Sequence, residues 1–178
     1  ESSRLLADFF AQSLDGCFVL RFPEPIRWPA LPAEQRDAAM AALTFLRVND
    51  AFAKQCGRAV PTLLGKSFSA VPCREVGAFG TAIAESLDQG HCLTSIELQG
   101  AGGVGVWVEM QLLADLDDAG QTLGVFGVQR DVTDKIAQQM ALLESDAKYS
   151  ATMRSAQVGI FMLQDQRFVF VNPRLSEY

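Results

Sequence analysis

Apolar and polar positions follow two different periods along the chain, and the changes of period mark the expected helices and strands. Apolar side chains recur every three or four residues in Ser3–Leu14 and in Val76–Gln89, where Val76, Phe79, Ile83 and Leu87 form one stripe. This spacing predicts amphipathic helices. Runs rich in aromatic and β-branched residues predict strands at Gly16–Phe22, Thr44–Val48, His91–Leu98, Val104–Ala114 and Thr122–Arg130.

The connection between the first two strands is unusually long. Pro23–Pro32 holds four prolines in ten positions, which a strand interior does not tolerate, so a loop is expected there. Pro32 is well placed to begin a helix over Ala33–Leu43, and Asn49 to open a short helix that reaches Cys56. The last three strands follow one another across short turns. This order predicts an α+β fold with an antiparallel sheet.

A pattern from the beginning of the chain returns near its end. Gly159-Ile-Phe-Met-Leu163 copies Gly16-Cys-Phe-Val-Leu20, and Phe168-Val-Phe-Val-Asn172 copies Phe45-Leu-Arg-Val-Asn49. The glycine and the asparagine are 33 positions apart in the first copy and 13 in the second. The difference matches Pro23–Leu43, which we interpret as an insertion in the turn of the first hairpin. The second copy is expected to be truncated.

Composition narrows the classes of function. The net charge of −6 and a pI near 4.8 argue against nucleic-acid binding, which needs a basic face. The chain has no run of about 18 apolar residues, so no membrane span is expected. Its cysteines form no C-x-x-C pair and are expected to be free thiols in a reducing cytosol. With His91 as the single histidine, the sequence shows neither a metal-ligand cluster nor a catalytic constellation, so the chain is not expected to be an enzyme.

Taken together, these segments resemble two PAS domains in tandem, the first complete and the second cut short. The residues that carry the resemblance are Gly16-Cys-Phe-Val-Leu, Val48-Asn49-Asp-Ala-Phe52, Leu64-Gly65-Lys, Trp107-Val-Glu, Gly124 and Gly127-Val-Gln-Arg-Asp131-Val-Thr133, with Gly159-Ile and Val171-Asn172-Pro173 in the second copy. The resemblance implies a five-stranded antiparallel sheet of order 2-1-5-4-3 with helices on one face. The implied parts are a PAS domain at 1–133 with an insertion at 23–43, a linker helix at 134–156 and the start of a second PAS domain at 157–178.

The same resemblance implies a sensory or regulatory module of a cytoplasmic bacterial signalling protein. Such modules usually precede a histidine kinase of a two-component system, a diguanylate cyclase, a phosphodiesterase or a transcription-activating domain. The module is expected to bind a small ligand; the alternative is a ligand-free module for dimerisation and protein–protein interaction. The candidate ligand-binding residues are Phe18, Leu20, Phe45, Phe79, Ile83, Trp107 and Phe126.

Two aromatic residues leave alternatives open. Trp107 alternates with Val106 and Val108, so it either lines the cavity or packs on the outer face of the sheet, and Glu109 on the same side favours the outer face. Trp28 in the insertion either covers the pocket or anchors the loop, and anchoring is favoured.

The identity of a cofactor is unknown from the sequence, but two are disfavoured. PAS domains that bind haem commonly use a histidine on the long helix, and Val76–Gln89 contains none. Light-sensing flavin domains of the LOV type carry Asn-Cys-Arg-Phe-Leu-Gln, whereas this chain has Pro72-Cys73-Arg74-Glu75-Val76. Flavin bound without a covalent bond stays an open alternative.

Signal transmission is expected at Asp131-Val132-Thr133, where the last strand becomes the linker helix. Asp131 or Thr133 can cap the first helical N–H groups, although these residues could also merely end the strand. Ile136, Met140 and Leu143 form a short seam on the helix, typical of a coiled coil or of a single amphipathic helix. A homodimer through the linker helix and the N-terminal helix is the expected assembly.

Overall fold

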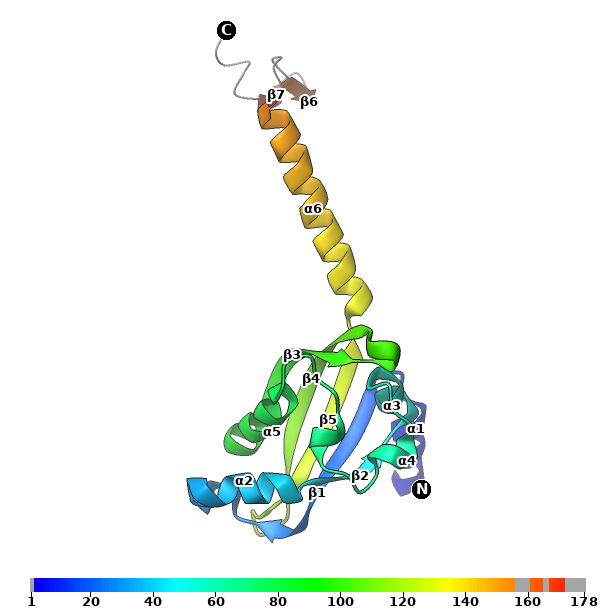
Figure 1. Ribbon diagram of the computed structural model, residues 1–178, viewed down its shortest axis with the longest axis vertical. Coiled ribbons are helices and arrows are strands. Elements are labelled where there is room, and N and C mark those ends of the chain that lie inside the picture. Colours follow the sequence, from blue (N-terminus) through cyan, green and yellow to red (C-terminus); the bar gives the residue numbers. More distant parts are fainter. Residues whose placement is uncertain (1, 156–160, 165–166, 172–178) are drawn as a thin grey trace. The chain divides into compact units, whose positions relative to one another are not determined.

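The computed structural model describes residues 2–155, 161–164 and 167–171 and divides the chain into two compact units, Glu1–Thr133 and Asp134–Tyr178. Figure 1 labels the elements of both units. In the first unit the strands are β1 (Gly16–Ile26), β2 (Thr44–Val48), β3 (His91–Gln99), β4 (Gly105–Leu116) and β5 (Thr122–Asp131). Its helices are α1 (Ser2–Gln12), α2 (Ala33–Ala42), α3 (Asp50–Gln55), α4 (Val60–Leu63) and α5 (Ala78–Gln89), with short 3₁₀ turns η1 (Trp28–Ala30), η2 (Phe68–Ala70) and η3 (Ala101–Gly103).

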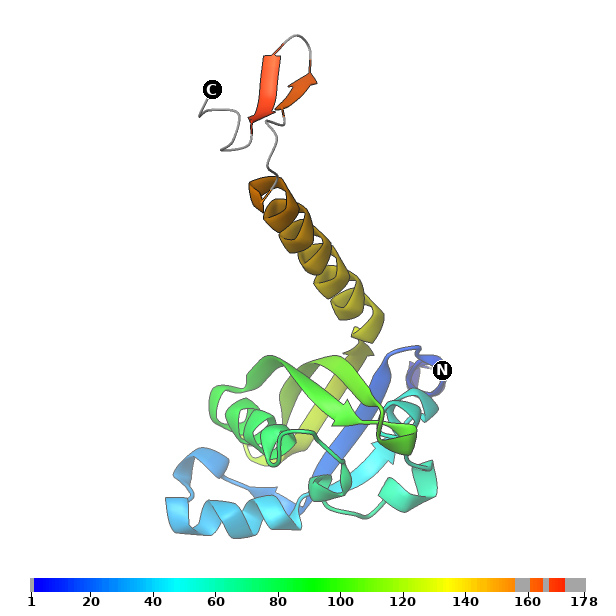
Figure 2. The ribbon, with the colours of Figure 1, turned by 45° about the horizontal axis from the view of Figure 1, so that its top comes forward.

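Within the described residues, the strands of the first unit form one five-stranded sheet in the order β2-β1-β5-β4-β3, and every neighbouring pair is antiparallel. This confirms the predicted fold class and strand order. β3, β4 and β5 follow one another as a meander, while β5 also pairs with β1. The first and last strands of the unit are therefore neighbours at the centre of the sheet (Figure 2).

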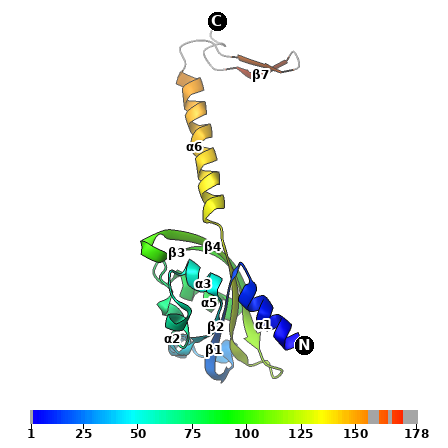
Figure 3. The same cartoon turned by 90° about the vertical axis from the view of Figure 1, so that its right-hand side faces the viewer.

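The sheet separates two layers of helices. Figure 3 shows α3 and α5 on one side of it and α1 on the other. The core lies between the sheet and the helices α3 and α5. Side chains of β1 and β4 alternate between this inner face and the outer face of the sheet, as the period of a strand requires. Phe18 and Leu20 on β1, and Val108, Met110 and Leu112 on β4, are all fully buried.

The first strand is longer than the sequence predicts. The loop expected from Pro23 begins only after Ile26, because β1 continues through Pro23 and Pro25. Pairing between β1 and β5 is interrupted between Arg21 and Ile26, and both prolines lie in that interruption. A proline lacks the N–H group that a ladder requires, so it is tolerated where no ladder bond is made.

The helix before β3 is shorter than expected. α5 begins at Ala78, behind Gly77, which adopts the left-handed conformation with φ of 88°. Val76 therefore lies outside the helix and is 97% exposed, so its place in the predicted apolar stripe is wrong. The rest of the stripe, Phe79, Ile83 and Leu87, is buried on the core side of α5.

The second unit contains helix α6 (Thr133–Ser155), which begins in the first unit, and a hairpin of β6 (Phe161–Gln164) and β7 (Arg167–Val171). Within the described residues the hairpin is a two-stranded antiparallel sheet. Gly159 and Asn172, which carry part of the sequence repeat, lie outside the described residues.

The two hairpins have the same register. In the first, Phe18, Val19, Leu20 and Arg21 face Val48, Arg47, Phe45 and Thr44; in the second, Phe161, Met162, Leu163 and Gln164 face Val171, Phe170, Phe168 and Arg167. Each pairing shifts once, after Val19 in one hairpin and after Met162 in the other. The bulged residues, Leu46 and Val169, are both 53% exposed. The sequence repeat is therefore also a repeat of strand pairing.

Candidate functional site

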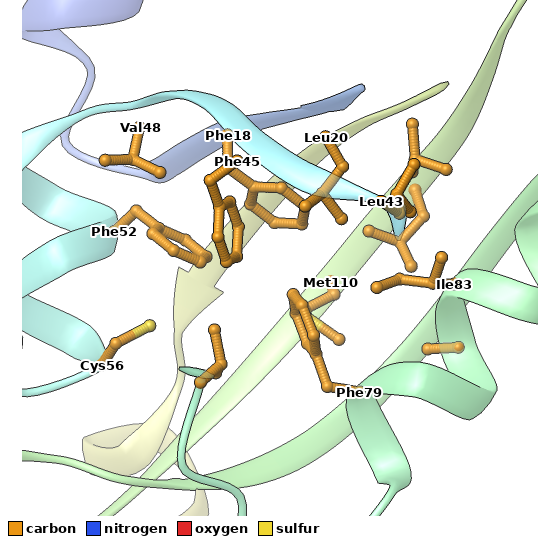
Figure 4. Packing of buried hydrophobic residues seen from close by; sticks show 14 of the residues in the cluster. Phe18, Leu20, Leu43, Phe45, Val48, Phe52, Cys56, Phe79, Ile83 and Met110 are labelled. Atoms are coloured by element: carbon orange, nitrogen blue, oxygen red, sulfur yellow. The ribbon is translucent and has the colours of Figure 1, made fainter. Parts of the chain in front are cut away.

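Aromatic rings from four elements meet at the centre of the core. The Phe18 ring on β1 lies 4.7 Å from Phe52 on α3, 5.6 Å from Phe79 on α5 and 5.9 Å from Phe45 on β2, measured between centroids. Figure 4 shows these four side chains pointing into the same part of the core from their different elements. None of the four side chains is more than 2% exposed. The chain's own rings therefore fill this part of the interior.

The structure brings five of the predicted ligand-binding residues together in this cluster: Phe18, Leu20, Phe45, Phe79 and Ile83. Phe52 also belongs to it, although the sequence analysis did not select it. The sequence did contain a signal for Phe52, because Asn49 as a helix cap places this residue in the first turn of α3, on the side that faces β1.

Trp107 and Phe126 lie elsewhere. Trp107 is on the face of β4 opposite the buried Val108, together with the exposed Glu109, and this is the outer side that Glu109 favoured. Phe126 is likewise on the opposite face of β5 from the buried Val125. Trp107 contributes to an open surface hollow of about 310 Å³ beside the Arg74–Glu97 ion pair.

A polar pair is buried beside the aromatic cluster. Gln129 on β5 is fully buried, and its Nε2 donates to Oε1 of Gln55 on α3 at 2.8 Å. Gly16 makes room for this pair, because a Cβ atom there would lie 2.4 Å from the Gln55 Oε1 and 2.8 Å from the Gln129 Cγ. The Oε1 of Gln129 has no hydrogen-bond partner among the described residues. An orphaned buried acceptor costs about 1–3 kcal/mol.

Asn49 joins three elements through one buried side chain. Its Oδ1 accepts from the backbone N–H of Phe52 at 2.9 Å, which caps α3, and from the N–H of Cys17 on β1 at 2.8 Å. Its Nδ2 donates to the carbonyl oxygens of Asp15 at 2.9 Å and Phe10 at 3.1 Å. The predicted cap is confirmed, and the same side chain also holds the connection between α1 and β1.

That connection reaches the end of β5 through an ion pair. Arg130 donates from Nη2 and Nε to the two carboxylate oxygens of Asp15, at 2.8 and 3.1 Å. The hydrogen bond from Arg130 lowers the pKa of Asp15. Since 115 positions separate the two residues, no local pattern in the sequence could reveal the contact.

The strand-to-helix junction is bonded to the neighbouring strand. Val132 N–H donates to the carbonyl oxygen of Trp107 at 2.8 Å, and the Thr133 hydroxyl oxygen accepts from the Trp107 N–H at 3.0 Å. The Asp131 carboxylate accepts from the Thr133 N–H at 2.9 Å. The first residue of α6 is therefore bonded directly to β4, and Asp131 supplies the helix with an acceptor for an otherwise unpaired N–H group.

The seam residues of α6 differ in exposure. Ile136 is half-buried, whereas Met140 and Leu143 are 67% and 68% exposed. On α1, Leu5 and Phe9 are both 72% exposed. Each helix thus presents large apolar side chains to solvent.

The thiols and the histidine lie outside any chemically active cluster. All four cysteines are free. Burial raises the pKa of the Cys56 thiol to about 12 and also raises the pKa of Cys73, which disfavours the reactive thiolate form. His91 is exposed at the start of β3. Over residues 2–155, 161–164 and 167–171, no three His, Cys, Asp or Glu residues are placed to hold a metal ion.

The described helices contain no segment that is both long and apolar enough to cross a membrane. The first unit combines a five-stranded antiparallel sheet, helices that cover the core on one face, and a junction between β5 and α6 that is hydrogen-bonded to β4. Together these features define the class of domain to which the site belongs.

The comparisons identify that class. The family profile described as PAS fold matches residues 40–137, more than half of the chain. The chain therefore belongs to the PAS family, whose domains are typically non-catalytic sensory modules. No curated protein sequence matches the chain.

Several solved structures are similar to this chain. The PAS domain of a protein from Colwellia psychrerythraea has a TM-score of 0.57 at 14% identity and covers 75% of this chain and 99% of that one. An RNA-binding Light-Oxygen-Voltage receptor has a TM-score of 0.59 at 20% identity and covers 81% of this chain, which spans only 38% of the receptor's length. The PAS domain of the fruit-fly ELK potassium channel has a TM-score of 0.51 at 12% identity, with coverages of 75% and 98%. At these identities the similarity concerns the fold alone.

Proposed function

We propose that the chain is the input module of a signal-transduction protein, and that its signal leaves through Asp131–Thr133 into α6. The observation that carries this proposal is the pair of hydrogen bonds between Trp107 and the junction, one at Val132 and one at Thr133. A change in the sheet moves β4, and β4 holds the first residue of the helix. The output is a histidine kinase, a diguanylate cyclase or phosphodiesterase, or a transcriptional regulator of a bacterial cytoplasmic pathway.

A second set of contacts supports the same route. Asn49 binds the end of α1 and the Asp15 turn, and Asp15 binds Arg130, immediately before the junction. The start of α3, the N-terminal helix and the exit strand thus form one hydrogen-bonded network. A displacement of α3 by an occupant of the core, or of α1 by a partner, reaches the start of α6 through the same few bonds.

The matching registers of the two hairpins support a tandem arrangement. β6–β7 repeats the pairing and the bulge of β1–β2. We propose that residues 157–178 begin a second PAS domain and that 134–156 link it to the first. The linker helix is then the exit of one module and the entrance of the next.

A ligand-free dimerisation module is the second candidate. The packed phenylalanine cluster and the exposed apolar residues of α1 and α6 favour it. In that case the protein self-associates through Leu5, Phe9, Met140 and Leu143, and a single monomeric species in sedimentation equilibrium would exclude it.

The junction can be tested by fusing residues 1–155 through α6 to a reporter histidine kinase and measuring autophosphorylation. Thr133→Val keeps the shape of the side chain and removes the acceptor for Trp107 N–H. We expect kinase activity to change by about two- to tenfold, the equivalent of one hydrogen bond. Thr81→Val is the matched control, because Thr81 is an exposed helical residue whose hydroxyl donates to the carbonyl oxygen of Gly77, immediately before α5. Equal activity in both variants would contradict the proposed route.

A further inference from the structure

One side chain of the insertion in the first hairpin is fully buried against the domain. Between Pro23 and Ala42, all of which the structure describes, Trp28 is the single buried residue, at 1% exposure. Helix α2 has no buried residue, and only its inward side, Ala39 and Met40, packs partly against the core. The insertion therefore covers the end of the core, with the Trp28 side chain inserted into the domain. We call this insertion, residues 23–42, the lid.

The slot that Trp28 fills has distinct walls. Its ring stacks on Phe22 of β1, with centroids 6.4 Å apart and an interplanar angle of 23°. The guanidinium carbon of Arg36 lies 5.2 Å from the centroid of the Trp28 ring. The indole Nε1–H donates to the Oδ1 of Asp88, near the end of α5, at 2.9 Å. An aromatic wall, a cationic neighbour and one anionic acceptor thus surround a flat ring.

A single carboxylate oxygen holds both parts of the lid. Arg36 Nη1 on α2 donates to the same Oδ1 of Asp88 at 2.9 Å. The Asp88 side chain is 46% exposed, so the acceptor end of the slot opens to solvent. Exposed ion pairs are weak, generally below about 1 kcal/mol, so this attachment can be exchanged for another donor.

The backbone of the lid adds little further attachment. Its hydrogen bonds between Arg27 and Leu43 outside α2 are local, from Ala30 to Arg27, from Leu31 to Trp28, from Gln35 to Pro32 and from Leu43 to Met40. The two prolines in this range, Pro29 and Pro32, supply no N–H groups. The hairpin itself does not need the insertion, because β6–β7 makes the same pairing with two residues between Gln164 and Arg167.

We propose that Trp28 is a tethered substitute for a ligand, and that the slot between Phe22 and Asp88 binds a flat aromatic molecule that donates an N–H group. Such a ligand stacks on Phe22, donates to Asp88 and displaces the lid. The proposal rests on the sensory function proposed above, since it names the ligand class and the moving part. A tethered side chain competes at an effective concentration in the millimolar range, so the ligand binds the intact protein only weakly unless its contacts exceed those of Trp28.

Displacement can be observed by ¹⁹F NMR on the full chain labelled with 5-fluorotryptophan. The chain has two tryptophans, so Trp107→Phe assigns the two resonances. Titration with indole is expected to move the Trp28 resonance toward the shift of free 5-fluorotryptophan in a saturable manner, while the Trp107 resonance serves as the internal control. A Trp28 resonance that stays in place up to the solubility limit of indole would overturn the lid.

The acceptor is tested with Trp28→Ala, which empties the slot. Calorimetry should show indole binding to this variant at least about tenfold more tightly than 1-methylindole, which has no N–H group. In Trp28→Ala combined with Asp88→Ala the two compounds should bind equally. Equal binding already in Trp28→Ala, or no binding, would overturn the assignment of the slot. If Trp28→Ala fails to fold by circular dichroism, Asp88→Ala alone must shift the Trp28 resonance without ligand, and an unmoved resonance overturns the proposal.

These readouts are independent of the junction. The kinase chimera changes only Thr133, and the ¹⁹F experiment follows only the lid. If indole leaves the Trp28 resonance in place but Thr133→Val changes kinase activity, this ligand site is rejected and the proposed function stands. If the Trp28 resonance moves but Thr133→Val leaves kinase activity unchanged, the route through α6 is rejected.

Discussion

The hairpins β1–β2 and β6–β7 have the same pairing and different surroundings. Both place phenylalanine opposite valine, and both shift register at the same step. β1 also pairs with β5 and lies under α3, whereas β6 and β7 form a two-stranded sheet within the described residues. Because the pairing is so similar in the two settings, we attribute it to the local sequence. The burial of β1 and β2 instead depends on elements that are distant along the chain.

The turn is where the two hairpins diverge. Arg21 and Thr44 are paired across 22 intervening residues, whereas two residues separate the equivalent Gln164 and Arg167. The longer turn adds Trp28 and α2 to one end of the domain and leaves the pairing unchanged. An insertion can therefore add residues to the edge of the core without altering the pairing of the hairpin that carries it.

The largest expected effect separates the hairpins by burial. Phe18→Ala removes the ring that contacts three other phenylalanines, and it should lower the free energy of unfolding by about 3–5 kcal/mol. Urea denaturation followed by circular dichroism measures the change. Phe161→Ala, at the equivalent register position outside the five-stranded sheet, should leave that transition in place. A similar loss in both variants would show that the two hairpins share one cooperative unit.

An intermediate effect is expected at the residue that follows the first hairpin. Asn49→Ala removes two accepted and two short donated hydrogen bonds from a buried position and should cost about 2–3 kcal/mol of unfolding free energy. Asp50→Ala, at the neighbouring exposed position, is the control and should change the urea midpoint little. A loss of only about 1 kcal/mol, the usual cost of removing an N-cap, would mean that Asn49 only caps α3 and does not join α1 to the sheet.

The smallest effect concerns the ion pair between Asp15, which precedes β1, and Arg130 on β5. Because Arg130 lowers the pKa of Asp15 in the folded state, the stabilisation is present above the ordinary value of 3.8 and is lost as the pH falls through the folded-state pKa. The urea midpoints of the wild type and Asp15→Asn should differ at pH 7 and converge in acid. A difference that grows below pH 3.8 would have the wrong sign.

The pattern of apolar residues predicted an antiparallel α+β sheet, and the resemblance to PAS domains implied its strand order. The sequence pattern also placed Ile83 on the apolar stripe of its helix and Asn49 at the start of another helix. It failed at Val76, because a left-handed Gly77 delays the helix, and at Pro23 and Pro25, because the gap in the ladder that admits them depends on β5. Local patterns describe local geometry.

The contacts at the junction and at the insertion were harder to foresee. The Asp131–Thr133 junction was visible as a change from strand to helix, but the bonds from Thr133 to Trp107 and from Arg130 to Asp15 join distant segments. Trp28 was visible as an aromatic residue among prolines, yet its acceptor on Asp88 lies 60 positions away. Neither partner follows from spacing, since each depends on how the helices pack on the sheet.

Amide hydrogen exchange at the start of α6 tests most directly whether the turn at Asp15, before β1, affects the junction at Asp131–Thr133, where α6 begins. Asp15→Asn breaks the ion pair to Arg130, and it should speed exchange at Val132 and in the first turn of α6 by about two- to tenfold. Asp115→Asn breaks the Arg21–Asp115 pair, whose nitrogen–oxygen distance is 2.9 Å and which lies away from the junction, and should leave these amides unchanged. Faster exchange in Asp15→Asn alone is the predicted result. Equal exchange in both variants would contradict transmission through the junction.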